Sequence, residues 1–130
     1  MCMSNLIVDK SKKRKETVAW KMMVYDRVLK EYLTPYQYTR IKNNKLKTRD
    51  KIDIRTEDYS DWLAGEPVEV KRLYGGAIHC FKTREYARKW RSHRPRRTRY
   101  KLFKVVGTRY VGENDTQIAF REIEFLDKVN

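Results

Sequence analysis

The last third of the chain carries the pattern that most limits its fold. "YKLFKVV", from Tyr100 to Val106, alternates apolar and polar residues, and so does the stretch from about Ile118 to Leu126. A period of two places one set of side chains on a buried face of a β-strand. Between these stretches the sequence favours a short strand over 109–111 and a turn over 112–115. We therefore expect a β-hairpin with one buried face.

Further strands are expected earlier in the chain. "VAWKMMVY" from Val18, "VEVKRLY" before the glycine pair 75–76, and "AIHCF" are rich in β-branched and aromatic residues, and 51–55 alternates briefly. The glycine pair indicates a turn with a positive φ, and Asn43-Asn44 and 65–67 indicate two more turns.

Two segments between these strands are ambiguous. "DRVLKEYL" has helical spacing but also fits a hairpin arm, and "TPYQYTRIKN" begins with the helix-start pair Thr34-Pro35 although its apolar residues also suit a strand.

One helix is well signalled. Thr83 is placed to cap a helix over 84–91, and Pro95 stops it. Spacing puts the arginines on one side of this helix and the apolar residues on the other, which are Tyr86, Ala87 and Trp90.

These elements predict an α+β fold, with a mostly antiparallel curved sheet, one amphipathic helix at about 84–91 and room for a second short helix. The length of 130 residues and a hydrophobic content of 40% suit one domain, which we place at 18–130. The polar stretch 1–17, with its "KSKKRK" run, is expected to be a flexible basic tail.

Charge indicates the class of partner. The chain has 31 Lys and Arg against 17 Asp and Glu, a formal net charge of +14. Such a field attracts polyanions, so nucleic acid or a host nucleoprotein is the expected partner, with an acidic protein groove as the competitor. A basic protein with no such partner is the plain alternative.

The positive charge is concentrated after the predicted helix start, where the acidic residue Glu85 faces many cations. Arginine predominates there, and its planar guanidinium suits bidentate phosphate contacts and stacking on bases. The residues predicted to bind the partner are Arg84, Arg88, Lys89, Arg91, Arg94, Arg96, Arg97, Arg99 and Lys101, together with Lys12, Lys13 and Arg14 of the tail. Zinc-finger, RNP and GXXG patterns are lacking, so binding is expected to be salt-sensitive rather than sequence-specific.

Catalytic candidates are few. His79 and Cys80 are neighbours, but in a strand they point to opposite faces, so we expect a buried Cys80 and a hydrogen-bonded His79. His79, His93 and Cys80 give no recognised metal-ligand spacing. We expect neither an enzyme nor a cofactor. The alternative is a small metal-dependent nuclease or transferase that uses His79 or the pair Glu122 and Glu124.

Cellular location follows from two features. The two cysteines, Cys2 and Cys80, form no disulfide framework, which favours a reducing interior. Apolar runs of membrane-spanning length are lacking. We expect a cytoplasmic protein without a membrane anchor and with no evident small-molecule substrate.

Four segments in this order resemble small uncharacterised proteins of bacteriophages and large DNA viruses: "VAWKMMVY", "YGGAIHCFKTREYARKW", "YKLFKVVG" and "IAFREIEFLDKV". In that group an opening strand leads to a G-x-H-x-F-x-T-x-x-x-A segment, which this chain carries with one more residue between glycine and histidine, and a strand pair closes the domain. The resemblance implies a viral accessory protein and supplies no catalytic residues. By analogy, such a protein could inhibit a host defence machine built on a nucleoprotein.

Overall fold

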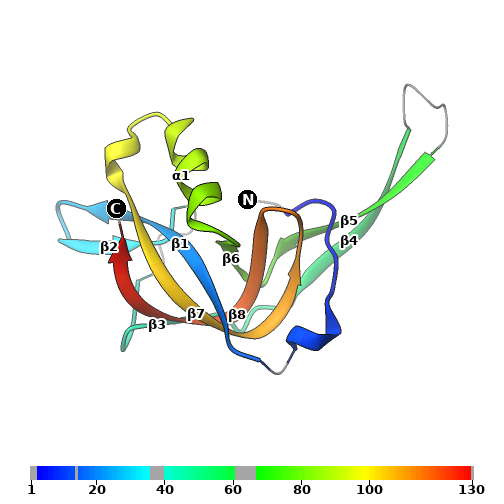
Figure 1. Cartoon of the computed structure of the whole chain (residues 1–130), viewed down its shortest axis with the longest axis horizontal. Helices are drawn as coiled ribbons and strands as arrows, with labels where there is room; N and C mark the ends of the chain where they lie inside the picture. The colour runs from blue at the N-terminus through cyan, green and yellow to red at the C-terminus, as the bar shows by residue number, and fades with distance from the viewer. Residues whose placement is uncertain (1–2, 14, 36–39, 61–66, 130) are drawn as a thin grey trace.

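Two long strands form the frame of the molecule in this computed structural model, which describes residues 3–13, 15–35, 40–60 and 67–129. They are β7 (Tyr100–Glu113) and β8 (Gln117–Val129), paired antiparallel over most of their length (Figure 1). The side chain of Asn114 caps their turn by accepting hydrogen bonds from the backbone N–H groups of Thr116 and Gln117. The predicted hairpin is confirmed.

The first part of this hairpin is longer than predicted. Strand β7 runs on without a break through Gly107, where the sequence suggested two separate strands. Gly107 is not a turn residue here. A Cβ at this position would lie 2.3 Å from the ring of Phe120, so the glycine lets the two strands approach around that ring.

The remaining strands complete a curved antiparallel sheet. Strand β1 (Thr17–Asp26) pairs with β7, and β6 (Ile78–Phe81) pairs with β8. Strand β1 also meets β6 at Trp20 and Phe81, so the pairings β1–β7–β8–β6–β1 close a ring. Strand β2 (Glu31–Leu33) extends the sheet beside β1, and β3 (Lys45–Lys47) extends it beside β8. The predicted α+β class with a mostly antiparallel sheet is confirmed.

A separate two-stranded arm projects from this body (Figure 1). It consists of β4 (Asp53–Ser60) and β5 (Pro67–Gly75), which pair along their whole length. The turn predicted at 65–67 lies mostly outside the described residues, with Pro67 beginning β5. The glycine pair follows β5, and only Gly76 has the positive φ expected there, at 84°.

The helix α1 (Arg84–Ser92) confirms the best-signalled element. The Thr83 hydroxyl accepts a hydrogen bond from the backbone N–H of Tyr86, as an N-cap does. Ala87 is fully buried and Trp90 packs beside it against Met22, Phe81 and Leu102. The prediction that Tyr86 faces inward is wrong. Tyr86 is 40% exposed, and the contacts of the helix with the sheet are made by Ala87 and Trp90.

The ambiguous segment after β1 is a hairpin rather than a helix. The Asp26 carboxylate accepts hydrogen bonds from the backbone N–H groups of Val28 and Leu29, which closes a turn and leads directly into β2. Asn43 and Asn44 both have positive φ and form the predicted turn. Of the helix suggested from Thr34, residues 36–39 lie outside the described residues.

The core lies inside the strand ring. Phe120, Ile123, Val105 and Cys80 are all nearly or fully buried there. A second cluster forms outside the ring, where α1 covers β1 and β6. A third cluster joins the first residues of the chain to β5 and β8.

This third cluster contradicts the flexible tail predicted for 1–17. Met3 is fully buried and pairs with Leu73 of β5, and Ile7 pairs with Glu113 of β7. Beyond them lies a short 3-10 helix, η1 (Lys10–Lys12). The prediction weighed the charged run and overlooked the apolar residues before it, which supply the buried contacts.

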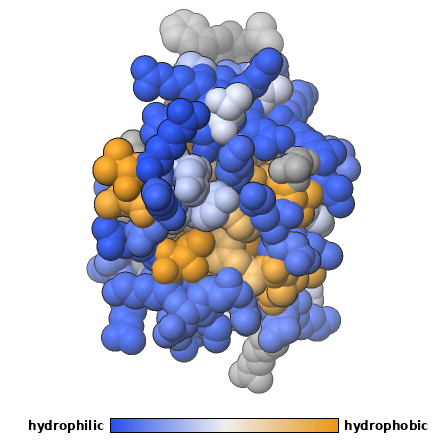
Figure 2. Space-filling view, turned by 90° about the vertical axis from the view of Figure 1, so that its left-hand side faces the viewer, coloured by the Kyte–Doolittle hydropathy of each residue, from blue (hydrophilic) through white to orange (hydrophobic). Residues whose placement is uncertain are grey.

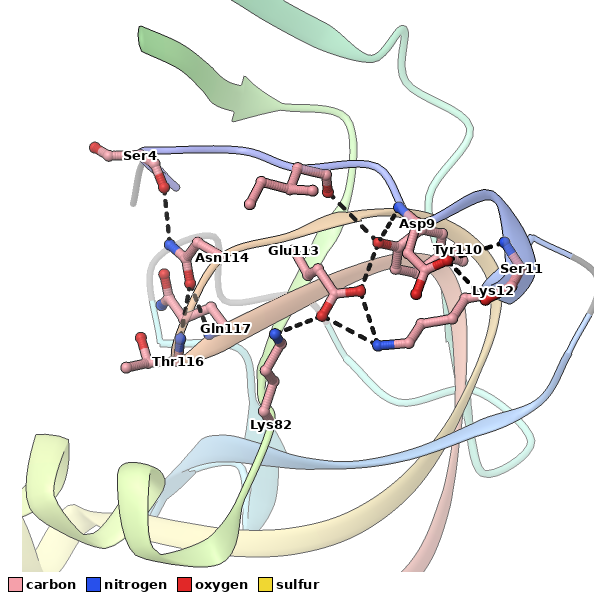
Figure 3. A network of polar contacts seen from close by, with 11 residues as sticks. Ser4, Asp9, Ser11, Lys12, Lys82, Tyr110, Glu113, Asn114, Thr116 and Gln117 are labelled. Carbon is pink, nitrogen blue, oxygen red and sulfur yellow. Dashed lines mark hydrogen bonds and ion pairs between the residues drawn. The ribbon is translucent and has the colours of Figure 1, made fainter.

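A buried carboxylate holds this segment in place (Figure 3). The Glu113 side chain is 2.8 Å from Lys12 Nζ, pairs also with Lys82, and accepts a hydrogen bond from the Tyr110 hydroxyl at 2.8 Å. Burial disfavours the charged form, but these hydrogen bonds outweigh it and lower the pKa of Glu113 to about 2. The Tyr110 hydroxyl in turn accepts a hydrogen bond from the backbone N–H of Asp9.

The lowered pKa predicts an acid-sensitive contribution to stability. The stabilisation is complete above the ordinary carboxyl pKa of 4.5 and is lost as the pH falls toward 2. We expect Glu113→Gln to lower the free energy of unfolding by about 2 kcal/mol at pH 7, with a smaller difference from the unaltered protein at pH 2.5. Urea unfolding at both pH values measures this difference. Asp115→Asn, at an exposed position, is the control and should change the free energy of unfolding at neither pH. An equal cost of Glu113→Gln at both pH values would contradict the assignment.

Candidate nucleic-acid interface

Nine of the cations predicted to bind a partner lie on consecutive elements: α1, the turn after it, the 3-10 helix η2 (Arg97–Arg99) and the start of β7. We call the surface that these residues form the arginine surface. Arg91 and Lys101 are half-buried and the other members are exposed. Its members are Arg84, Arg88, Lys89, Arg91, Arg94, Arg96, Arg97, Arg99 and Lys101.

The cations of this surface have little counter-charge. Arg88 aside, none of these cations forms an ion pair with another described residue. The ion pairs among the described residues involve other cations and the carboxylates of Glu31, Asp53, Glu57, Glu113 and Glu122. Asp26 lines a depression with Arg96 and Arg99, and Glu85 lies on α1. Most of the positive charge nevertheless faces solvent without an ion pair, and an anionic partner would neutralise it.

Two of the arginines are positioned by contacts with the protein. The Arg94 guanidinium lies 4.4 Å from the centre of the Trp90 ring, which is the geometry of a cation–π contact. The Nη1 atom of Arg91 donates a hydrogen bond to the carbonyl oxygen of Tyr100 at 3.4 Å. Arg96 adopts the left-handed conformation, with a φ of 54°, where the chain turns from the helix back toward β7. This turn presents Arg97 and Arg99 beside the helix end.

The structure adds Arg27, which sequence reasoning missed. The turn between β1 and β2 lies beside η2, and Asp26, Arg27 and Val28 line a depression there with Arg96, Arg99 and Lys101. The pairing of Val24 with Tyr100 brings these distant segments together. Arg27 is the one arginine in the segment 26–33, and nothing in the sequence indicates that it lies beside the arginine surface.

The face that contains this turn is mostly hydrophilic, with separate hydrophobic patches between the polar residues (Figure 2). Val28 is 90% exposed at the edge of the basic depression. A partner that covers the depression would therefore also meet an apolar side chain.

The tail residues predicted to join this surface do not do so. Lys12 is paired with Glu113, which also pairs with Lys82 just before α1, and η1 lies below and to the right of α1 in Figure 1. Lys13 follows η1 and is exposed, and Arg14 lies outside the described residues. The sequence could not show that residues 3–13 turn away from the arginines to cover the sheet.

His79 and Cys80 point to opposite faces of β6, as predicted. Burial raises the pKa of the Cys80 thiol to about 11, and Cys80 packs in the core. Burial, together with the nearby Lys21 charge, lowers the pKa of His79 to about 4. The expectation of a hydrogen-bonded His79 is wrong for one ring nitrogen: Nδ1 is buried and has no hydrogen-bond partner among the described residues.

A pocket of about 290 Å³ lies where β1 and β6 diverge beyond their contact at Trp20 and Phe81. Lys21 reaches it from β1, and its Nζ donates a hydrogen bond to the His79 carbonyl oxygen at 2.8 Å. Burial lowers the pKa of this ammonium group. Trp90 of α1 also lines the pocket, so the pocket adjoins the arginine surface.

The acidic pair proposed for the nuclease alternative has other contacts. Glu122 lies 3.5 Å from Lys47 Nζ and 3.9 Å from Lys45 Nζ, while Glu124 is exposed. Among the described residues, His, Cys, Asp and Glu side chains form no group of three that could hold a metal ion. In the same part of the chain no helix is long and apolar enough to cross a membrane.

Comparison with known proteins gives no match to a family, to a curated protein or to a solved structure. The resemblance to phage and DNA-virus proteins therefore stays an expectation, and the case for function depends on the geometry above.

Proposed function

We propose that this protein binds nucleic acid, free or within a nucleoprotein, through the arginine surface. The observation that carries the proposal is the concentration of nine mostly exposed cations over residues 84–101, where Glu85 is the acidic residue of the segment. Arg27 extends this surface across the β1–β2 turn. Guanidinium groups suit phosphate oxygens in both charge and planar geometry.

Binding of this kind would depend on phosphate and on the shape of the strand more than on base sequence. The cations lie on a helix end, a turn and a strand start, and none of these arrangements matches a groove-reading motif. Phosphate contacts fix position without specifying sequence.

Salt dependence tests the proposal. If about six phosphates are contacted, the logarithm of the association constant for a duplex should fall with the logarithm of salt concentration with a slope of about −5. Fluorescence anisotropy of a labelled 20-base-pair DNA and an RNA hairpin, titrated at several salt concentrations, measures this slope. Absence of binding at low salt, or binding that does not change with salt concentration, would contradict the proposal.

Recovery of partners from infected-cell extract separates free nucleic acid from a nucleoprotein target. Immobilised protein is incubated with the extract before and after nuclease treatment. Loss of every partner after nuclease treatment supports nucleic acid as the direct ligand. Retention of a specific protein supports the hypothesis of an inhibitor that occupies a nucleoprotein machine.

A further inference from the structure

The pocket between β1 and β6 shares a residue with the arginine surface. Trp90 lines the pocket, and its ring also carries the guanidinium of Arg94. A strand whose phosphates lie along the arginines would therefore pass close to the pocket mouth. At about 290 Å³, the pocket is at the small end of the range for small-molecule sites, so it suits a single planar group rather than a folded segment.

The walls of the pocket combine aromatic rings with buried polar groups that lack partners. Tyr74, Phe81 and Trp90 supply the rings. The Nε1–H of Trp90 and the Nδ1 of His79 have no hydrogen-bond partner among the described residues and are almost fully shielded from solvent, so a ligand reaches them only after a small shift of these side chains. Pairing with a ligand would recover the cost of leaving them unpaired.

These groups match the hydrogen-bonding edge of a base. A neutral imidazole has one donor and one acceptor nitrogen, and an indole has one donor. The pKa of about 4 keeps His79 neutral at pH 7. Bases present donors and acceptors side by side on an edge and stack on aromatic rings. Arg49 lines the same pocket, is exposed and suits the attached phosphate, whereas Lys47 is paired with Glu122 and Lys21 is buried.

We propose that the pocket receives one unpaired nucleobase from a single strand whose phosphates lie on the arginine surface. This inference rests on the proposed function and deepens it, because it predicts a preference for unpaired bases. An unpaired base enters without the cost of opening a duplex.

Gly75 provides a way to close the pocket. It lines the pocket, and a Cβ placed on it meets no atom within 4 Å, so a larger side chain there enters open space. The test compares the unaltered protein, Gly75→Leu and the smaller Gly75→Ala. The probes are a labelled ten-nucleotide DNA or RNA strand, the same backbone made entirely of abasic sites, and a blunt DNA duplex.

We expect the unaltered protein to bind the strand with bases about 10-fold more tightly than the abasic backbone. Gly75→Leu should remove that difference and leave duplex binding unchanged, while Gly75→Ala should retain it. Trp90→Phe, which keeps a ring and removes the Nε1–H, should reduce the difference several-fold, and this variant decides the question if Gly75→Leu does not fold.

The outcomes separate the pocket from the surface. If the unaltered protein binds the abasic backbone as tightly as the strand with bases, the pocket proposal is wrong while the arginine surface stands. The same holds if a folded Gly75→Leu keeps the difference. If the unaltered protein binds none of the three probes, the proposed function itself fails.

Discussion

Replacing Arg94, Arg96, Arg97 and Arg99 together with alanine is expected to weaken the binding of a 20-base-pair DNA at least 100-fold at 0.1 M salt, on the order expected for four lost phosphate contacts. The slope of the logarithm of the association constant against the logarithm of salt concentration should become less steep by about 3 to 4. These side chains are exposed, so folding should change little. The largest folding cost is the contact of Arg94 with Trp90, about 0.5–1 kcal/mol. Anisotropy and thermal unfolding measure the two effects separately.

A second variant with the same loss of charge shows whether position matters. It removes four exposed lysines that lie outside the arginine surface: Lys10, Lys13, Lys42 and Lys71. Both variants carry four fewer positive charges, so long-range attraction weakens equally. We expect the lysine variant to bind within about 5-fold of the unaltered protein. Equal losses in the two variants would show that net charge, and not the arginine surface, controls binding.

The sequence predicted the features of this fold that depend on residues close to one another in the chain. Thr83 caps α1 because its hydroxyl meets a backbone N–H three residues on, a contact that the sequence spacing already implies. In β8, Ile118 and Phe120 and then Ile123 and Phe125 contact the core. The alternation shifts between these two pairs, and Ala119 is also buried, against the first residues of the chain. His79 and Cys80 lie on opposite faces of β6 because successive side chains of a strand alternate.

Features that depend on long-range pairing were not predictable. The ring closes through a contact between Trp20 and Phe81, and Arg27 reaches the arginine surface through the pairing of β1 with β7. None of these three residues carries a local sequence signal for the segment that it contacts. The pocket is also a product of this closure, since it lies where β1 and β6 diverge.

The first residues of the chain show how one signal can hide another. The basic run predicted a solvated tail, but Met3 and Leu6 before it are buried, and Glu113 neutralises Lys12. Two of the residues predicted to bind the partner, Lys12 and Lys13, therefore lie on the segment that Glu113 holds in place and not among the arginines. A charged run predicts exposure of its own side chains, and it says little about the segment that carries it.

Gly107→Ala is expected to destabilise the protein by about 3 kcal/mol and to lower its melting temperature by about 10 °C. The added Cβ would lie 2.3 Å from Cδ2 and 2.4 Å from Cγ of Phe120. Phe120 is fully buried in the strand ring, so its ring has little space to move into. Thermal unfolding followed by circular dichroism measures the effect, with Gly75→Ala as the control, because a Cβ at Gly75 meets no atom within 4 Å.

The clash with Phe120 can be isolated by a double-mutant cycle. Phe120→Leu alone should destabilise the core by leaving space beside β7. In that background Gly107→Ala should cost much less, because the smaller side chain leaves room for the new methyl group. A coupling energy of about 1–2 kcal/mol between the two positions would therefore follow from direct contact. If Gly107→Ala costs the same in both backgrounds, the glycine is required by the backbone of β7 and not by the approach of the Phe120 ring.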